Sequence, residues 1–354
     1  MSSHLAPHCP LWQGLRAQQV HTVAVMGMTK NTGKTVSLNH LLAQAHAERL
    51  TVGLTSIGRD GEAHDQVYAI PKTPVRVTPG NLVATASDTL VRAKARIKLI
   101  DTTGVSSPMG EILIVKVIEA GEMEVAGASR NHDQHKVIAL LRQCGADMIM
   151  LDGALGRSHH ASPAMADGVV LATGAAIGGG IADVLRKTHD RLTILGIPPA
   201  PAEILARTQA VWAHGGVGAW DQQGDCLFHD HIATINAAPA LLANDLKAIS
   251  TVAVSGAVGK RLWQALQHIA QHQPGLTLIV ADGTRLFVDA TDLHTFERLG
   301  GRVLALRAIR LLGITLNPSS PFGGSFNARE FLALARQTFP QHLVTDVLLT
   351  KEGT

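Results

Sequence analysis

Residues 22–40 are Thr22-Val-Ala-Val-Met-Gly-Met-Thr-Lys-Asn-Thr-Gly-Lys-Thr-Val-Ser-Leu-Asn-His40, and this stretch decides the fold. An apolar run, Val23–Met26, leads into a glycine, and a helix-compatible run begins at the triplet Gly33-Lys34-Thr35. The order predicts a strand, a glycine loop and a helix. Backbone N–H groups of such a loop converge on a phosphate, and the helix N-terminus adds partial positive charge at the same place. The stretch therefore predicts a phosphate-binding loop.

Two side chains of this loop carry the expected chemistry. The Lys34 ammonium would reach the β- and γ-phosphates of a nucleotide, and the Thr35 hydroxyl would ligate Mg²⁺. The common spacing would need glycine at position 28, and here glycine stands one residue earlier. The alternative is a tight strand-to-helix turn with an accidental Gly-Lys-Thr. The predicted nucleotide-binding set is Gly27, Thr29, Lys30, Asn31, Thr32, Gly33, Lys34 and Thr35.

The offset glycine carries a family resemblance. Gly27, five residues, and then Gly33-Lys34-Thr35 resemble the loop of dethiobiotin synthetases and cobyrinic acid amide synthases, in the broad group of MinD-type ATPases. Lys30 is similar to the second lysine of MinD-like loops, one residue later. The resemblance covers roughly residues 1–180. It implies a P-loop NTPase: an α/β fold with a doubly wound, mostly parallel sheet that binds ATP or GTP with Mg²⁺.

Acidic residues follow two further predicted strands. Asp60 follows the strand expected over residues 51–56, and Asp101 begins a D-x-x-G motif at the end of the strand expected over residues 97–104. Ligands of open α/β sheets bind beyond the carboxyl ends of the strands. Asp101 would hold Mg²⁺ through water while the Gly104 N–H meets the γ-phosphate. Both aspartates have an alternative interpretation as turn residues.

A third acidic strand end is Asp152, after the buried strand expected over residues 147–151. The segment Asp152-Gly-Ala-Leu-Gly-Arg157 is similar to the Glu-Gly-Ala-Gly-Gly segment of dethiobiotin synthetases, in which the acidic residue faces Mg²⁺. The resemblance implies that Asp152 acts there through the metal, by way of water because Asp is shorter than Glu. The expected catalytic residues are Lys34, Asp101 and Asp152, and the expected metal ligands are Thr35, Asp60, Asp101 and Asp152.

The length of 354 residues favours two domains. A glycine-rich stretch, His214–Gly218, is the expected boundary, with a nucleotide-binding domain over 1–214 and a smaller α/β domain for a partner or substrate over 215–354. Residues 82–95 are expected to be helical and 192–197 to be a strand. Two apolar runs, 112–118 and 123–126, are expected to form a hairpin inserted in the parallel sheet.

Composition excludes several functions. Net charge is 31 − 28 = +3 and aromatic residues are only 3% of the chain, so no nucleic-acid partner is expected. No apolar run is long enough for a membrane span. Three widely spaced cysteines without a CxxC pair indicate a reducing, cytoplasmic setting. The 18 histidines lack structural zinc spacing and are interpreted as surface residues. A homo-oligomer remains open.

Three uses of triphosphate chemistry fit these motifs. The dethiobiotin-synthetase resemblance implies a ligase that activates a small carboxylate with ATP. The segment 152–157 together with Asn317-Pro-Ser-Ser-Pro321 resembles the ATPase-like reactivase of B12-dependent lysine 5,6-aminomutase, which implies a chaperone that acts on a partner enzyme. The histidines and D-x-x-G suggest a metal-insertion GTPase. Absence of an Asn-Lys-x-Asp motif favours ATP over GTP.

Overall fold

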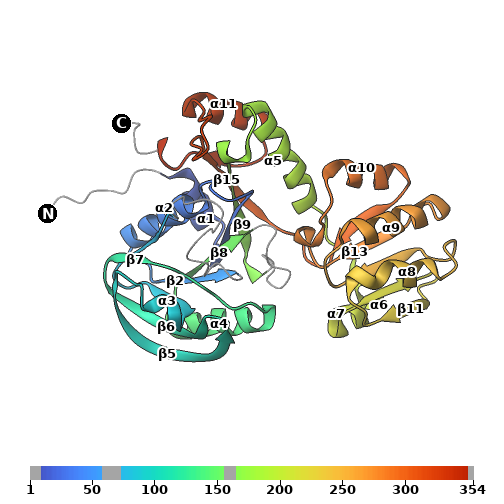
Figure 1. Ribbon diagram of the computed structural model, residues 1–354, viewed down its shortest axis with the longest axis horizontal. Helices are drawn as coiled ribbons and strands as arrows, with labels where there is room; N and C mark the ends of the chain where they lie inside the picture. The colour runs from blue at the N-terminus through green and yellow to red at the C-terminus, as the bar shows by residue number, and fades with distance from the viewer. Residues whose placement is uncertain (1–8, 58–72, 155–164, 350–354) are drawn as a thin grey trace. The chain divides into compact units, whose positions relative to one another are not determined.

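The computed structural model describes residues 9–57, 73–154 and 165–349. The chain divides into two compact units (Figure 1). Unit 1 comprises Met1–Thr188 and Arg310–Thr354, and unit 2 comprises His189–Ile309. Each unit is an α/β structure with its own sheet and core.

Unit 1 is built on a mostly parallel sheet of nine strands among the described residues, in the order β16-β15-β9-β1-β8-β2-β4-β6-β5. The neighbouring strands from β16 to β4 in this order pair in parallel, and only the β4–β6 and β6–β5 pairs are antiparallel. The strands are β1 (Thr22–Gly27), β2 (Val52–Ile57), β4 (Leu82–Ala86), β5 (Arg96–Ser107), β6 (Gly110–Glu119), β8 (Met148–Ala154), β9 (Gly168–Gly174), β15 (Leu311–Asn317) and β16 (Val344–Thr345). A small separate ladder joins β3 (Val75–Val77) to β7 (Gly121–Met123).

The central strands are continuous apolar runs because parallel strands are covered on both faces. β1 and β9 are buried at every residue. Parallel register places Gly27 of β1 beside Ala154 of β8 and Ala172 of β9. The carboxyl ends of these three strands therefore lie at one level, where the loop that follows β1 begins.

The helices of unit 1 bury apolar faces against this sheet. In α2, Leu38, Leu41, Leu42 and Ala45 are buried, as their helical spacing predicts, and they join the main core of the unit. The unit contains α1 (Pro10–Ala17), α2 (Lys34–Ala47), α3 (Ser87–Leu90), α4 (Asn131–Gln143), the first half of α5 (Ile181–Leu195) and α11 (Ala328–Thr338).

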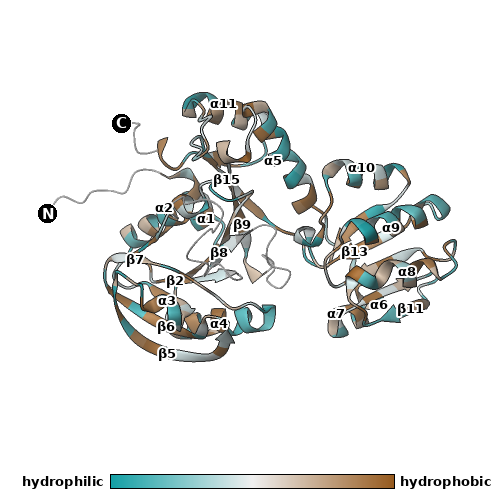
Figure 2. Ribbon diagram, viewed as in Figure 1, coloured by the Kyte–Doolittle hydropathy of each residue, from teal (hydrophilic) through white to brown (hydrophobic). Residues whose placement is uncertain are grey.

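Unit 2 has a five-stranded sheet in the order β11-β10-β12-β13-β14. Helix α9 packs into the core of this unit through its hydrophobic side, which is visible in Figure 2. That side buries Leu262, Trp263, Leu266 and Ile269. The strands are β10 (Val217–Trp220), β11 (Cys226–Asp230), β12 (Thr251–Val254), β13 (Thr277–Val280) and β14 (Arg302–Ala305). The helices are α6 (Ala202–Arg207), α7 (Gln209–His214), α8 (Ala237–Leu242), α9 (Lys260–His272) and α10 (Ala290–Arg298).

The predicted domain boundary differs from the observed division. Residues 189–214 lie in unit 2, and residues 310–354 return to unit 1. The return follows from strand pairing, because β15 adds to the free edge of β9 and β16 adds to β15.

Three predicted elements were wrong. Residues 82–95 begin as β4 followed by the short helix α3, and residues 192–195 end helix α5 rather than form a strand. The run 112–118 lies in β6 and pairs with β5 and β4, whereas residues 121–123 pair with β3, so the expected hairpin does not form. No helix within the described ranges is both long and apolar enough to cross a membrane.

Candidate functional site

The loop between β1 and α2 lies at the carboxyl edge of the sheet. Its first N–H, of Met28, donates to Ala172 O of β9 at 2.9 Å. Inside the loop, the Thr32 hydroxyl donates to Thr29 O at 2.9 Å, and Thr32 is 1% exposed. The loop is therefore fastened at its base and folded back on itself. Lys30 and Asn31 lie exposed at its outer turn.

Both glycines of the motif are required by the loop's path. Gly33 is the N-cap of α2 with φ +88°, a conformation that L-residues other than glycine rarely adopt. A Cβ on Gly33 would also lie 2.8 Å from Asn317 Cβ. A Cβ on Gly27 would lie 2.8 Å from the Thr32 hydroxyl oxygen. The glycine spacing of the sequence thus has a steric reason in this fold.

Lys34 and Asp152 meet across the carboxyl ends of β1 and β8. Lys34, the first residue of α2, places Nζ 3.0 Å from Asp152 Oδ1. The side chains are only 18% and 6% exposed, so the pair is largely shielded from water. Thr35 is the next residue of α2 and is half-buried. The Ser56 hydroxyl of β2 donates to Asp152 O at 3.1 Å, which fixes the backbone of this strand end.

The far end of the chain supports the loop. Asn317, the last residue of β15, donates its side-chain N–H to Asn31 O at 2.9 Å. The Ser37 hydroxyl of α2 lies 2.7 Å from the Thr315 hydroxyl of β15. In the sequence, the Asn317 segment contributed to a family resemblance, and these supporting contacts were missed. Only the pairing of β15 with β9 could have revealed them, and no local motif encodes it.

Asp101 and Gly104 do not belong to this site, contrary to the sequence-based prediction. Asp101 lies in the middle of β5, the strand at one edge of the sheet, and four strands separate β5 from β1. At about 4.8 Å per strand spacing, the separation along the sheet is roughly 24 Å. The Gly104 N–H donates to Glu111 Oε1 at 3.0 Å. The D-x-x-G motif is part of the long curved β5–β6 ribbon (Figure 1).

Other residues that were expected at the site lie either away from it or outside the described part of the chain. Asp60 and the segment 155–157 lie outside the described residues. Among the residues that the structure describes, no cluster of three or more His, Cys, Asp or Glu side chains is arranged to hold a metal ion. Of the proposed metal ligands, Thr35 directly follows Lys34 in α2, and Asp152 pairs with Lys34.

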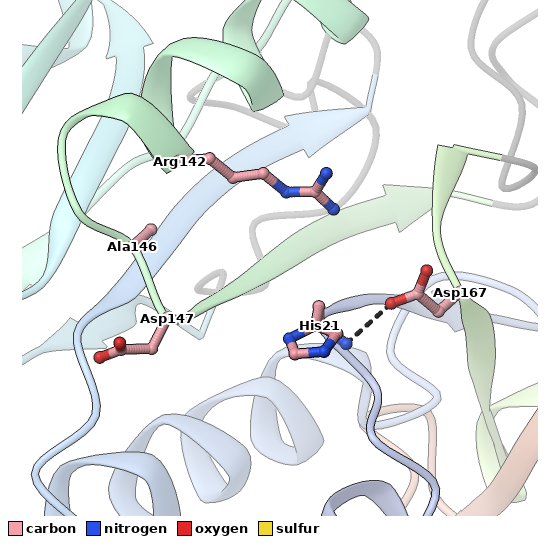
Figure 3. Close-up of a pocket in the computed structure, with 5 residues that line it drawn as sticks. All are labelled: His21, Arg142, Ala146, Asp147 and Asp167. Carbon is pink, nitrogen blue, oxygen red and sulfur yellow. Dashed lines mark hydrogen bonds between the residues drawn. The ribbon is translucent and has the colours of Figure 1, made fainter.

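A cavity of about 340 Å³ lies at the opposite, amino edge of the strands (Figure 3). Its polar side chains fasten strand starts: Asp167 Oδ2 accepts N–H bonds from His21 and Thr22, and Asp147 Oδ2 accepts one from Thr51. Arg142 donates to the Thr22 hydroxyl at 2.9 Å. These contacts give the polar side chains of the cavity a structural role at the starts of the strands. The loop between β1 and α2 therefore remains the candidate site.

Comparisons with family models, curated proteins and solved structures give no match for this chain.

Proposed function

We propose that the chain binds a nucleoside triphosphate with Mg²⁺ and hydrolyses it, with ATP as the favoured nucleotide. The observation that carries the proposal is the shielded Lys34–Asp152 pair at the start of α2, directly after the glycine loop. A cation and a carboxylate at a helix N-terminus can serve the phosphates and their metal ion, respectively.

The residues at the loop fit this ligand. The loop N–H groups and the start of α2 would hold the phosphates, and Lys34 would exchange Asp152 for the γ-phosphate oxygens. Asp152 and the Thr35 hydroxyl would then hold the metal ion, directly or through water. Bound Mg²⁺ would neutralise charge on the β- and γ-phosphates. The Asn317 amide and the Thr315 hydroxyl position the loop rather than the nucleotide.

Titration calorimetry with Mg-ATP and Mg-GTP tests the binding. Lys34→Ala is expected to abolish measurable affinity for both nucleotides, because a point charge at the phosphates is lost. An unchanged affinity would remove the loop from the proposal.

A pair of matched substitutions tests the catalytic role. Asp152→Asn is expected to lower turnover more than nucleotide affinity, because the amide keeps the size and loses the charge. Asp101→Asn is the control: the same chemical change, made on the exposed, remote strand β5, is expected to leave turnover at the parent rate. Equal turnover of all three proteins would refute the assignment of Asp152.

A further inference from the structure

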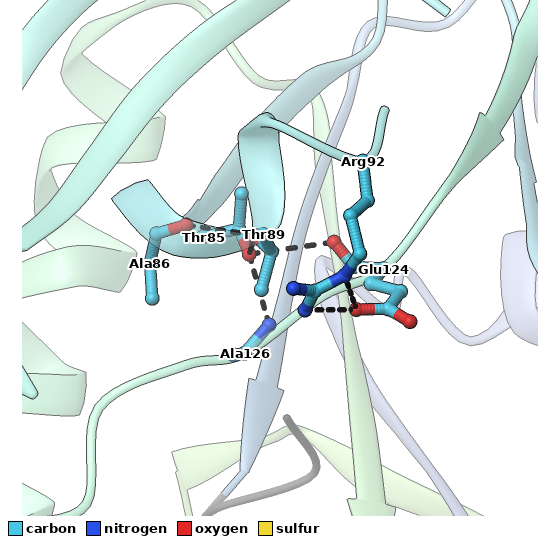
Figure 4. A network of polar contacts seen from close by, with 6 residues as sticks. All are labelled: Thr85, Ala86, Thr89, Arg92, Glu124 and Ala126. Atoms are coloured by element: carbon cyan, nitrogen blue, oxygen red, sulfur yellow. Dashed lines mark hydrogen bonds and ion pairs between the residues drawn. The ribbon is translucent and has the colours of Figure 1, made fainter. Parts of the chain in front are cut away.

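The segment that leads into α4 crosses the carboxyl ends of β4 and β2. Figure 4 shows how it is held against β4 and the turn after α3: the Ala126 N–H donates to the Thr85 hydroxyl at 2.9 Å, and Arg92 of that turn binds Glu124 Oε2 at 2.7 Å. The Ala86 N–H donates to Ala126 O at 3.0 Å. The path of this segment is therefore fixed before it reaches β2.

At β2 the segment reaches the surroundings of Asp152. Gly127 lies so close to Ser56 that a Cβ on the glycine would be 1.9 Å from Ser56 O. Ser56 in turn donates its hydroxyl to Asp152 O. Ser56 thus connects the segment before α4 with the backbone of Asp152.

The N-terminus of α4 lies just beyond, and two buried side-chain groups there lack a hydrogen-bond partner among the described residues. Arg130 occupies the N-cap position without a side-chain cap bond, where an acceptor side chain is usual. Gln134, in the first turn, is fully buried, and its Oε1 accepts the Ala128 N–H at 3.2 Å. Within the described ranges, Gln134 Nε2 and the Ser129 hydroxyl have no hydrogen-bond partner.

All of these groups can donate hydrogen bonds or carry positive charge, so they favour an anion. Gln134 Nε2 and the helix N–H groups are donors, the Ser129 hydroxyl can donate as well, and Arg130 adds an exposed positive charge. The helix N-terminus adds partial positive charge. A buried donor without an acceptor costs stability, which a bound anion would recover.

We propose that the turn Ala128–Arg130 and the first turn of α4 bind the carboxylate group of a small molecule. A planar two-oxygen anion suits one amide and one hydroxyl, whereas the triphosphate is served by the separate glycine loop. Ser129 is half-buried and Arg130 is exposed, so the turn reaches the surface, while Ser129 Oγ and Gln134 Nε2 are themselves covered by neighbouring atoms. Gly127, directly before this turn, lies against Ser56, whose hydroxyl binds the backbone oxygen of Asp152, so the bound carboxylate would lie on the side of the sheet edge that holds Asp152. Its role as the substrate activated by ATP rests on the proposed function, but its binding does not.

A fluorine NMR titration of the full chain with trifluoroacetate tests the binding directly. The parent protein is expected to broaden and shift the ligand signal saturably. Gln134→Glu keeps an oxygen for the Ala128 N–H, replaces the donor by a negative charge, and is expected to weaken binding about tenfold or more. Gln143→Glu, the same change on the exposed last turn of α4, is the control and is expected to bind as the parent does.

Two more variants keep the test decisive. Ser129→Ala, at a half-buried position, is expected to weaken binding severalfold even if Gln134→Glu fails to fold, which thermal melting would show. Lys34→Ala is expected to retain trifluoroacetate binding while it loses nucleotide, so the two proposals can fail separately. Absence of saturable binding to the parent, or parent-like binding by Ser129→Ala and by folded Gln134→Glu, would overturn the proposal.

Discussion

At the scale of single residues, Lys34 and Asp152 depend on each other for their burial. Removing one partner of a shielded ion pair leaves the other charge without compensation. Asp152 is only 4% exposed and Lys34 Nζ is a cation beside it, so Lys34 is expected to contribute to stability as well as charge to a ligand.

Lys34→Ala is therefore expected to lower the free energy of unfolding by about 3 kcal/mol. Adding Asp152→Asn to this variant should recover more than half of the loss, because the unpaired charge is removed. Nucleotide binding should stay lost in the double variant. Urea unfolding of the parent, both single variants and the double variant measures the coupling. Additive losses would show that the two side chains act independently.

Gly33 supports a second prediction at this scale. Gly33→Ala is expected to destabilise the protein by about 1–3 kcal/mol, because φ is +88° and the new Cβ would meet Asn317 Cβ at 2.8 Å. Nucleotide affinity should fall as the loop shifts. Gly180→Ala is the control, since a Cβ there has no heavy atom within 4 Å and φ is not in the left-handed region. Thermal melting of both variants decides, and equal melting temperatures would count against the loop geometry.

At the scale of elements, the strand–loop–helix unit could be predicted because its signals are local. Apolar residues form β1, glycines permit the turn, and helical spacing places Leu38 and Leu41 in the core. The strand that ends in Asp152 was predicted for the same reason. Residues 82–86 were mistaken for helix because a short buried strand and a short helix have similar apolar content, and only pairing with β2 and β6 makes them a strand.

The D-x-x-G motif was placed wrongly because sequence does not say where a strand lies in its sheet. Residues 96–107 do form a strand, yet β6 pairs with it in antiparallel fashion and holds it at the edge. Asp101 consequently lies near Cys144, at the end of α4. Burial of the Cys144 thiol, and secondarily the charge of Asp101, raise the pKa of Cys144 above its ordinary value.

This neighbourhood predicts a change in thiol reactivity. Asp101→Asn is expected to lower the pKa of Cys144, so a larger thiolate fraction exists at pH 8 and iodoacetamide reacts faster with Cys144. The effect should be modest, because burial is the larger cause and the substitution leaves it in place. Mass spectrometry of the alkylated peptides measures the rate, with exposed Cys226 of unit 2 as the internal reference. A slower reaction at Cys144 would place Asp101 elsewhere.

At the scale of the whole molecule, the two units do not follow one another along the chain, because unit 1 is formed by two separate segments. A glycine-rich stretch at 214–218 looked like a boundary, but Gly216 and Gly218 belong to the start of unit 2's sheet, where a side chain would collide with Asp230 O or the Trp220 ring. The final strands return to unit 1, and Thr315 and Asn317 support the phosphate loop from there. No local composition signals such a return, because β15 resembles any buried strand.

The return of β15 predicts which shortened chain retains the site. A chain that ends at Gly215 lacks β15 and β16, which exposes the edge of β9 and removes both supporting contacts of the loop. We expect it to be insoluble or to lack nucleotide affinity. Within unit 2, the first and last segments lie side by side: Pro199 and Ala305 form a parallel bridge, and the Ala200 N–H donates to Ala305 O at 2.8 Å.

Replacing residues 200–305 by about four Gly and Ser residues should therefore be tolerated, because bridged backbones lie only about 5 Å apart. This internal deletion keeps every described strand of the nine-stranded sheet. We expect a soluble protein with a cooperative thermal transition and, if the proposed function holds, with nucleotide affinity close to that of the parent. Melting curves test the fold independently of any ligand. A deletion protein that precipitates while the chain ending at Gly215 stays folded would contradict the division into units and the role assigned to β15.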